Sequence, residues 1–224
     1  MTPRTTRLVR IALVGGIASS LLYAAMNVFV PMQWEGYNSA SQTVSELSAV
    51  DAPTRPLWVS LAIIYSLLVA AFGWAVWTTA GRSRGLRVLG GLIVVNAVIG
   101  LAWPPMHQRE VIAAGGGTLT DTLHIVWTIV TNILFMSQIG LAAAAFGKRF
   151  RFYSMATMVM LVGFGVLTGM DAPRLEANLP TPWIGVWERI GIGVFMLWFA
   201  VLSTVLLRAK DAEAMTGRRE AVAA

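Results

Sequence analysis

Residues 57–80 read LWVSLAIIYSLLVAAFGWAVWTTA, and residues 81–87, GRSRGLR, follow directly. The first segment contains no charged residue, whereas the second carries three arginines. A helix needs roughly 20 apolar residues to cross a hydrocarbon core of about 30 Å, and arginines collect in cytoplasmic connections. This stretch therefore predicts a transmembrane helix whose C-terminal end faces the cytoplasm.

Apolar segments of this kind occur six times along the chain. The expected spans are Leu8–Val30, Leu57–Ala80, Leu86–Trp103, Thr122–Phe146, Phe152–Gly169 and Trp183–Leu207. Hydrophobic residues make up 56% of the chain and charged residues 12%, which is too little charge to cover a water-soluble globule of 224 residues. We therefore expect an all-α integral membrane domain over residues 1–207. A cytoplasmic tail at 208–224 follows, which we expect to be disordered or a frayed helix.

Basic residues alternate with the apolar segments. Clusters at 82–87, 148–151 and 208–210 fall in every second connection or terminus, while most acidic residues lie in the others. Because lysine and arginine collect on the cytoplasmic side, this alternation predicts that both termini lie in the cytoplasm. The inner connections are short and the outer ones long, so we expect three helical hairpins. The net charge of +6 is divided among short clusters, which argues against a nucleic-acid partner.

The first outer connection contains residues 43–46, Thr-Val-Ser-Glu, a pattern that fits a capping box. In that interpretation Thr43 caps a short helix, and Glu46 returns a bond to the backbone of the cap. Alternatively, Ser45 and Glu46 face a cavity at the outer membrane surface. There Ser45 would bind a ligand oxygen or act as a nucleophile beside a base.

Both histidines of the chain, His107 and His124, lie near the outer ends of expected helices. Asp121 precedes His124 by three residues, so the two side chains project from one helix face. A carboxylate placed there can orient the imidazole and raise its proton affinity, as a general base requires. In the alternative, Asp121 caps the first turn of its helix and His124 merely lies at the interface.

Glu188 and Arg189 are ionisable residues inside the last expected span, about two turns from its start. Charged groups within a span are costly and normally face partners in the bundle interior, which indicates a functional site. The alternative is a structural salt bridge, for instance from Arg189 to Asp121 or Asp171, or a side chain that extends to the headgroups.

Asparagines on three different helices lie below this layer of charge: Asn27, Asn96 and Asn132. Together they could form the floor of a polar cavity that holds a substrate. Hydrogen bonding between helices is the better explanation for each of them taken separately.

Three motifs carry a resemblance to a known family. They are Ser45-Glu46-Leu47, Asp121-x-x-His124 and the segment Pro180–Ile190, which reads PTPWIGVWERI. With them, residues 8–207 resemble a family of bacterial six-helix membrane proteins catalogued as domain of unknown function 998. The resemblance implies six helices in a bacterial cytoplasmic membrane, but it supplies no activity.

A second, partial likeness is to the superfamily of membrane hydrolases that includes alkaline ceramidases and hemolysin III-like proteins. Those proteins place serine, aspartate and histidines around zinc at one membrane face. This chain departs from them, because it has only His107 and His124 and no histidine in its last span. Two histidines with Asp121 or Glu188 would reach the minimum for catalytic zinc, but their spacing has no metal signature. We expect neither a metal nor another cofactor.

The first functional hypothesis is an enzyme that acts on a lipid or another amphipathic substrate from the bilayer. His124 would be its acid or base, Asp121 would orient His124, and Glu188 would be a second carboxyl group. The residues expected around the substrate are Arg189, for an anionic headgroup, with Ser45, Glu46, His107 and Asn96. The first alternative is a small transporter, in which Glu188 and His124 carry protons, or a ligand-binding membrane protein. The second is a structural or assembly subunit without catalysis.

Overall fold

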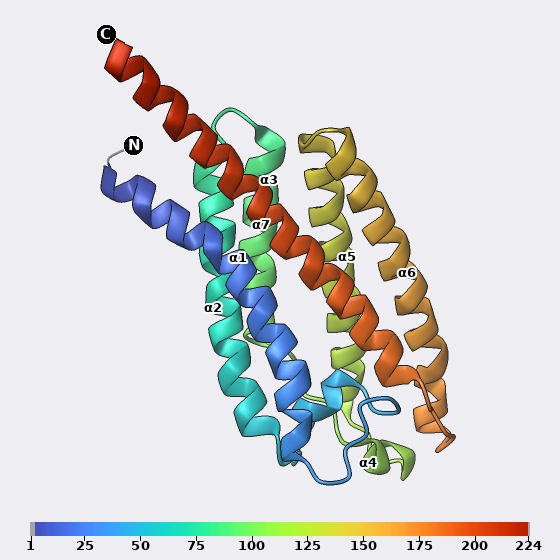
Figure 1. Ribbon diagram of the computed structural model, residues 1–224. Helices are drawn as coiled ribbons and strands as arrows, with labels where there is room; N and C mark the ends of the chain where they lie inside the picture. The colour runs from blue at the N-terminus through green and yellow to red at the C-terminus, as the bar shows by residue number, and fades with distance from the viewer. Residues whose placement is uncertain (1–2, 224) are drawn as a thin grey trace.

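The computed structural model describes residues 3–223, so the expected domain and tail extend beyond it only at Met1, Thr2 and Ala224. It contains helices and no strand within those residues (Figure 1). The α-helices are α1 (Pro3–Phe29), α2 (Arg55–Thr79), α3 (Arg84–Gly100), α4 (Arg109–Ala113), α5 (Leu119–Ala145), α6 (Lys148–Glu176) and α7 (Ile184–Ala223). Two short 3-10 helices, η1 (Pro31–Gln33) and η2 (Val44–Ser48), lie between α1 and α2.

Five helices, α1, α2, α5, α6 and α7, are long and apolar enough to cross a membrane. The chain is therefore a multi-pass membrane protein, as its composition predicts. The remaining expected span, Leu86–Trp103, is also helical. It corresponds to α3, which has only 17 residues. At about 1.5 Å per residue it rises about 26 Å, slightly less than the hydrocarbon core.

The long helices contact one another in chain order, and α7 returns to contact α1 as well as α6. The segments expected to form three hairpins are thus parts of one continuous bundle. Both termini lie at one end of it, together with the α2–α3 and α5–α6 turns (Figure 1). We call this the terminus end. The other end, which we call the loop end, carries the connections 30–54, 101–118 and 177–183.

α6 and α7 extend furthest beyond the C-terminal limits expected for them. α6 ends at Glu176 rather than near Gly169, with Pro173 and Arg174 in its last turns. α7 continues as helix to Ala223, so the tail has the helical one of its two expected forms as far as the structure describes it. The residues that follow Leu207 are rich in alanine, lysine, arginine and glutamate, which are strong helix formers.

Two groups of buried apolar side chains hold the bundle together. The larger one lies between the long helices and includes the fully buried aromatic residues Phe72, Phe195, Trp198 and Phe199. The smaller one lies at the loop end, where Val44 and Leu47 of η2 pack with Met26, Val30 and Trp58. This second group anchors residues 30–54, which we call loop 1, to the ends of α1 and α2.

Candidate functional site

Loop 1 is folded back on the loop end of the bundle, and η2 forms its ordered centre. Thr43 and Glu46 form the capping box that the sequence pattern predicts. The backbone N–H of Thr43 donates to the Glu46 carboxylate over 2.8 Å. This bond explains why Glu46 points inward, but it uses only one of the two carboxylate oxygens.

The Glu46 carboxylate also forms a two-pronged ion pair with Arg109 of α4. Nε of Arg109 lies 2.8 Å from one carboxylate oxygen, and Nη2 lies 2.7 Å from the other. Only 1% of the Glu46 side chain is exposed, against 21% for Arg109. The bond to Glu46 raises the pKa of the Arg109 guanidinium above its usual value, although partial burial acts the other way.

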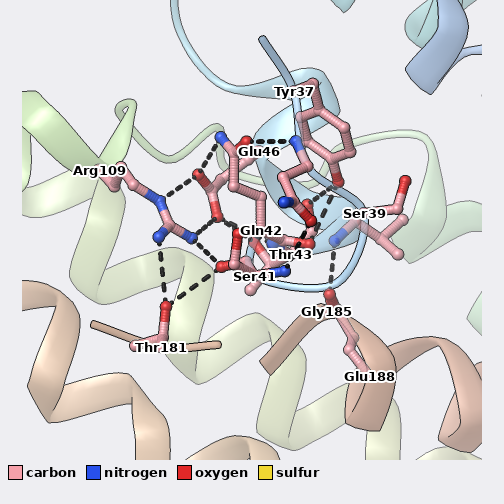
Figure 2. A network of polar contacts seen from close by, with 12 residues as sticks. Tyr37, Ser39, Ser41, Gln42, Thr43, Glu46, Arg109, Thr181, Gly185 and Glu188 are labelled. Atoms are coloured by element: carbon pink, nitrogen blue, oxygen red, sulfur yellow. Dashed lines mark hydrogen bonds and ion pairs between the residues drawn. The ribbon is translucent and has the colours of Figure 1, made fainter. Parts of the chain in front are cut away.

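Arg109 further connects loop 1 with the segment before α7 (Figure 2). It donates to the carbonyl oxygen of Ser41 over 2.7 Å and to the hydroxyl of Thr181 over 3.2 Å. Arg109 was not among the residues selected from the sequence. The signal was nevertheless present, because the outer connections contain few basic residues and a buried carboxylate needs a cation.

Ser45, the residue before Glu46, forms a hydrogen bond with His124 of α5. Its Oγ lies 3.0 Å from Nε2, while Nδ1 of the same imidazole lies 2.7 Å from the carbonyl oxygen of Pro104. A carbonyl oxygen can only accept, so Nδ1 carries a proton. In the neutral imidazole Nε2 then accepts from the serine hydroxyl. His124 is 8% exposed and Ser45 is partly exposed. The arrangement is that of a serine whose hydroxyl proton faces a base.

Asp121 does not orient His124, contrary to the expectation from their spacing. One of its oxygens accepts from the backbone N–H of His107 over 2.6 Å, and the other lies 2.9 Å from Nδ1 of His107. Asp121 also forms a capping box with Thr118 at the start of α5. The structure thus favours the alternative role for Asp121, and Pro104 supplies the partner that the sequence could not reveal.

Glu188, on the first turns of α7, accepts the backbone N–H of Val44 over 2.5 Å. This bond places its carboxylate against the residue that precedes Ser45. Glu188 therefore contacts the backbone that presents the serine, and not the serine hydroxyl or the imidazole.

Arg189 is enclosed by loop 1. Its Nη1 donates to the carbonyl oxygens of Ser39 over 2.7 Å and of Gln42 over 3.0 Å, and its Nη2 donates to the Tyr37 hydroxyl over 2.6 Å. Burial raises the pKa of Tyr37 to about 12, although the nearby Arg189 acts in the opposite direction. The alternative salt bridge from Arg189 to Asp121 or Asp171 is not formed in the described part of the chain, because the partners of Arg189 are backbone carbonyls and the Tyr37 hydroxyl.

Loop 1 touches α7 so closely that Gly185 has no room for a side chain. A Cβ atom there would lie 2.1 Å from the Gln42 carbonyl oxygen and 2.4 Å from that of Ser39. The backbone N–H of Gly185 donates to the carbonyl oxygen of Ala40 over 2.9 Å. Gly185 thus allows loop 1 to lie on the first turn of α7 (Figure 2). Ser45 belongs to the same loop.

The three asparagines do not form a common floor. Asn132 is exposed on α5, and its side chain donates to the Thr128 carbonyl oxygen one turn earlier. Asn96 is buried on α3, and its Oδ1 has no hydrogen-bond partner among the described residues. Asn27 donates to the carbonyl oxygen of Tyr23 within α1.

A shallow depression of about 440 Å³ opens at the loop end. Trp34, Asn38, Ser41, Gln42 and Arg109 are among the residues that line it, whereas Ser45 and His124 are not. The serine and histidine therefore lie outside this depression.

Among the side chains that the structure describes, no group of three or more from histidine, aspartate or glutamate is placed to hold a metal ion. His107 pairs with Asp121, and His124 pairs with Ser45, so the two histidines serve different contacts. This donor set does not supply the three-histidine zinc site of the membrane hydrolases to which the chain has a partial likeness.

The comparison with protein families identifies one family. The sequence model of the family described as protein of unknown function (DUF998) matches residues 17–205. The chain belongs to this family. No curated protein and no solved structure matches the chain. The family match confirms the first resemblance, and nothing supports the second.

Proposed function

We propose that this member of the DUF998 family is a membrane-embedded acyl-transferring enzyme, a hydrolase or transferase of lipid or other amphipathic esters, with Ser45 as nucleophile and His124 as base. The observation that carries the proposal is the hydrogen bond of 3.0 Å between Ser45 Oγ and His124 Nε2. A serine is a weak nucleophile by itself and needs an adjacent base to become reactive.

The chemistry follows from the protonation of His124. Because Nδ1–H donates to the Pro104 carbonyl oxygen, the lone pair of Nε2 receives the serine proton as Oγ attacks the ester carbonyl carbon. The ester C–O bond then breaks, the leaving alcohol takes the proton from Nε2, and the acyl group stays on Ser45. Water or an acceptor alcohol next attacks the acyl carbon and gives its proton to Nε2. The bond from that carbon to Ser45 Oγ then breaks, and Nε2 returns the proton to Oγ.

The surroundings of His124 support an amphipathic substrate. On α5 its neighbours Leu123, Ile125 and Val126 are exposed, and in a membrane they face lipid. An ester group at the interface could reach Ser45 while its acyl chains remain in the bilayer.

The other candidate residues are assigned to positioning. Glu188 holds the backbone of Val44, and the ion pair of Glu46 and Arg109 fixes η2, so both keep Ser45 in place. Arg189 is occupied by loop 1, and we assign it to holding that loop rather than to binding an anionic headgroup.

The membrane arrangement belongs to the same proposal. We place six spans, α3 included, in a bacterial cytoplasmic membrane, with both termini in the cytoplasm and Ser45 at the outer surface. The basic clusters of the short turns and the position of both termini at one end support this orientation (Figure 1).

The test is covalent labelling of the purified protein by a lipid-like fluorophosphonate, a probe that reacts with base-activated serines. We expect one adduct, mapped to Ser45 by mass spectrometry. Ser45→Ala should abolish it, and His124→Gln should slow it by at least about 100-fold, the usual effect of losing a general base. Asp121→Asn should slow it by less than about tenfold, whereas a carboxylate that orients a catalytic histidine is worth about 10⁴-fold.

Ser60→Ala is the matched control, because Ser60 is an exposed serine of α2 whose hydroxyl donates to its own helix. It should leave labelling unchanged, and each variant must elute and unfold like the unmodified protein. Absence of an adduct on the folded protein, or equal labelling of His124→Gln, would refute the enzyme and favour an assembly subunit.

A further inference from the structure

A second hollow lies at the terminus end of the bundle, the end opposite to Ser45. Its volume is about 460 Å³, and it is lined by Trp77 of α2 and by Arg84, Arg87, Val88, Gly91 and Leu92 of α3. We call it the α2–α3 groove. It is open on one side, and its lining residues flank the turn between α2 and α3 in the sequence.

Glycines shape the groove. A Cβ atom on Gly90 would lie 2.5 Å from the backbone nitrogen of Trp77, so only glycine lets α2 and α3 approach this closely. A Cβ atom on Gly91 would lie 3.0 Å from the indole ring, which therefore rests on the backbone of α3. The Trp77 side chain remains 51% exposed and forms one wall.

The groove combines this apolar wall with two uncompensated positive charges. The Arg84 side chain is exposed and forms neither a hydrogen bond nor an ion pair with the described residues. Arg87 donates through Nη2 to the Gly81 carbonyl oxygen over 2.7 Å, which leaves its charge without a carboxylate partner in the described part of the chain. The lining contains no acidic residue.

We propose that the α2–α3 groove binds one anionic phospholipid, with its phosphate between Arg84 and Arg87 and its acyl chains against Trp77, Val88 and Leu92. Guanidinium groups match phosphate oxygens, and basic pockets between membrane helices bind acidic headgroups. The tryptophan lies where the polar and apolar parts of such a lipid meet. The site is independent of Ser45, since it lies at the opposite end of the bundle.

The test measures lipid retained by the purified protein in detergent, by native mass spectrometry. The probes are phosphatidylglycerol and phosphatidylcholine with identical acyl chains, each with and without excess inorganic phosphate. We expect phosphatidylglycerol to be retained preferentially and phosphate to compete weakly. Arg84→Gln with Arg87→Gln should lower retention of phosphatidylglycerol by about tenfold.

The control pair is Lys148→Gln with Arg149→Gln, which removes the same charge from exposed residues at the start of α6, outside the groove. It should lower retention by less than about twofold. Arg84→Gln alone is measured as well, because it removes one charge and leaves the bond from Arg87 to the turn intact. Equal losses in both pairs would reduce the site to general charge attraction. Full competition by inorganic phosphate would mean that the groove binds a free anion and not a phospholipid. Either outcome overturns the proposal.

Discussion

At the residue scale, the ion pair of Glu46 and Arg109 has the largest consequence for stability. Arg109→Gln leaves a carboxylate that is 1% exposed without its cation, and such a loss typically costs about 3 kcal/mol. We expect a lower free energy of unfolding by about this amount, measured by denaturant titration in detergent micelles.

Arg174→Gln provides the comparison for that variant. Its contact with Asp171 is 3.8 Å long and its side chain is 45% exposed, so removing it should change stability by less than about 1 kcal/mol. If the two variants lose equal stability, Arg109 is no more than a surface charge, and loop 1 must be held by its apolar contacts.

The same residues show how far sequence reasoning extends. The capping box of Thr43 and Glu46 and the location of Ser45, His124 and Glu188 near one end of the bundle could be predicted, because they depend on local patterns and on span boundaries. The pairing of His124 could not. Spacing pointed to Asp121, but the actual partner is the carbonyl of Pro104, and a backbone group leaves no mark in a sequence.

At the element scale, the contact between loop 1 and α7 positions Ser45, and Gly185 permits it. Gly185→Ala would place a Cβ atom within 2.1 Å of a loop 1 carbonyl oxygen, so the loop must move. We expect the rate of fluorophosphonate labelling to fall more than about tenfold, with a loss of about 1–3 kcal/mol in stability.

Gly193→Ala is the matched change in the same helix, because a Cβ atom there has no neighbour within 4 Å. It should leave labelling unchanged and alter stability by less than about 1 kcal/mol. Equal labelling of both variants would mean that the position of loop 1 does not depend on α7. The helices themselves could be predicted from apolar runs, whereas this contact joins residues more than a hundred positions apart and needs the fold.

At the scale of the whole molecule, α3 decides the topology. Its 17 residues are shorter than those of the five helices that clearly suit a membrane, yet both termini lie at the same end of the bundle. Six crossings place the termini on one side of the membrane, whereas five place them on opposite sides. The distribution of charged residues along the sequence predicts six crossings.

The chain contains no cysteine, so a single introduced cysteine reports its own side without background. The positions chosen for replacement by cysteine are exposed. Glu35 and Glu176 lie at the loop end, and Gly147 lies in the turn between α5 and α6. Between Glu35 and Glu176 the chain runs through α2, α3, α5 and α6. If α3 crosses, a membrane-impermeant maleimide added to intact cells labels both glutamate replacements, and Gly147→Cys only after permeabilisation. If α3 does not cross, the two glutamate replacements fall on opposite sides, and Gly147→Cys reacts like Glu35→Cys. In that case the connections of the loop end, where Ser45 lies, would be divided between the two sides of the membrane. An enzyme at the outer surface would then have no structural basis.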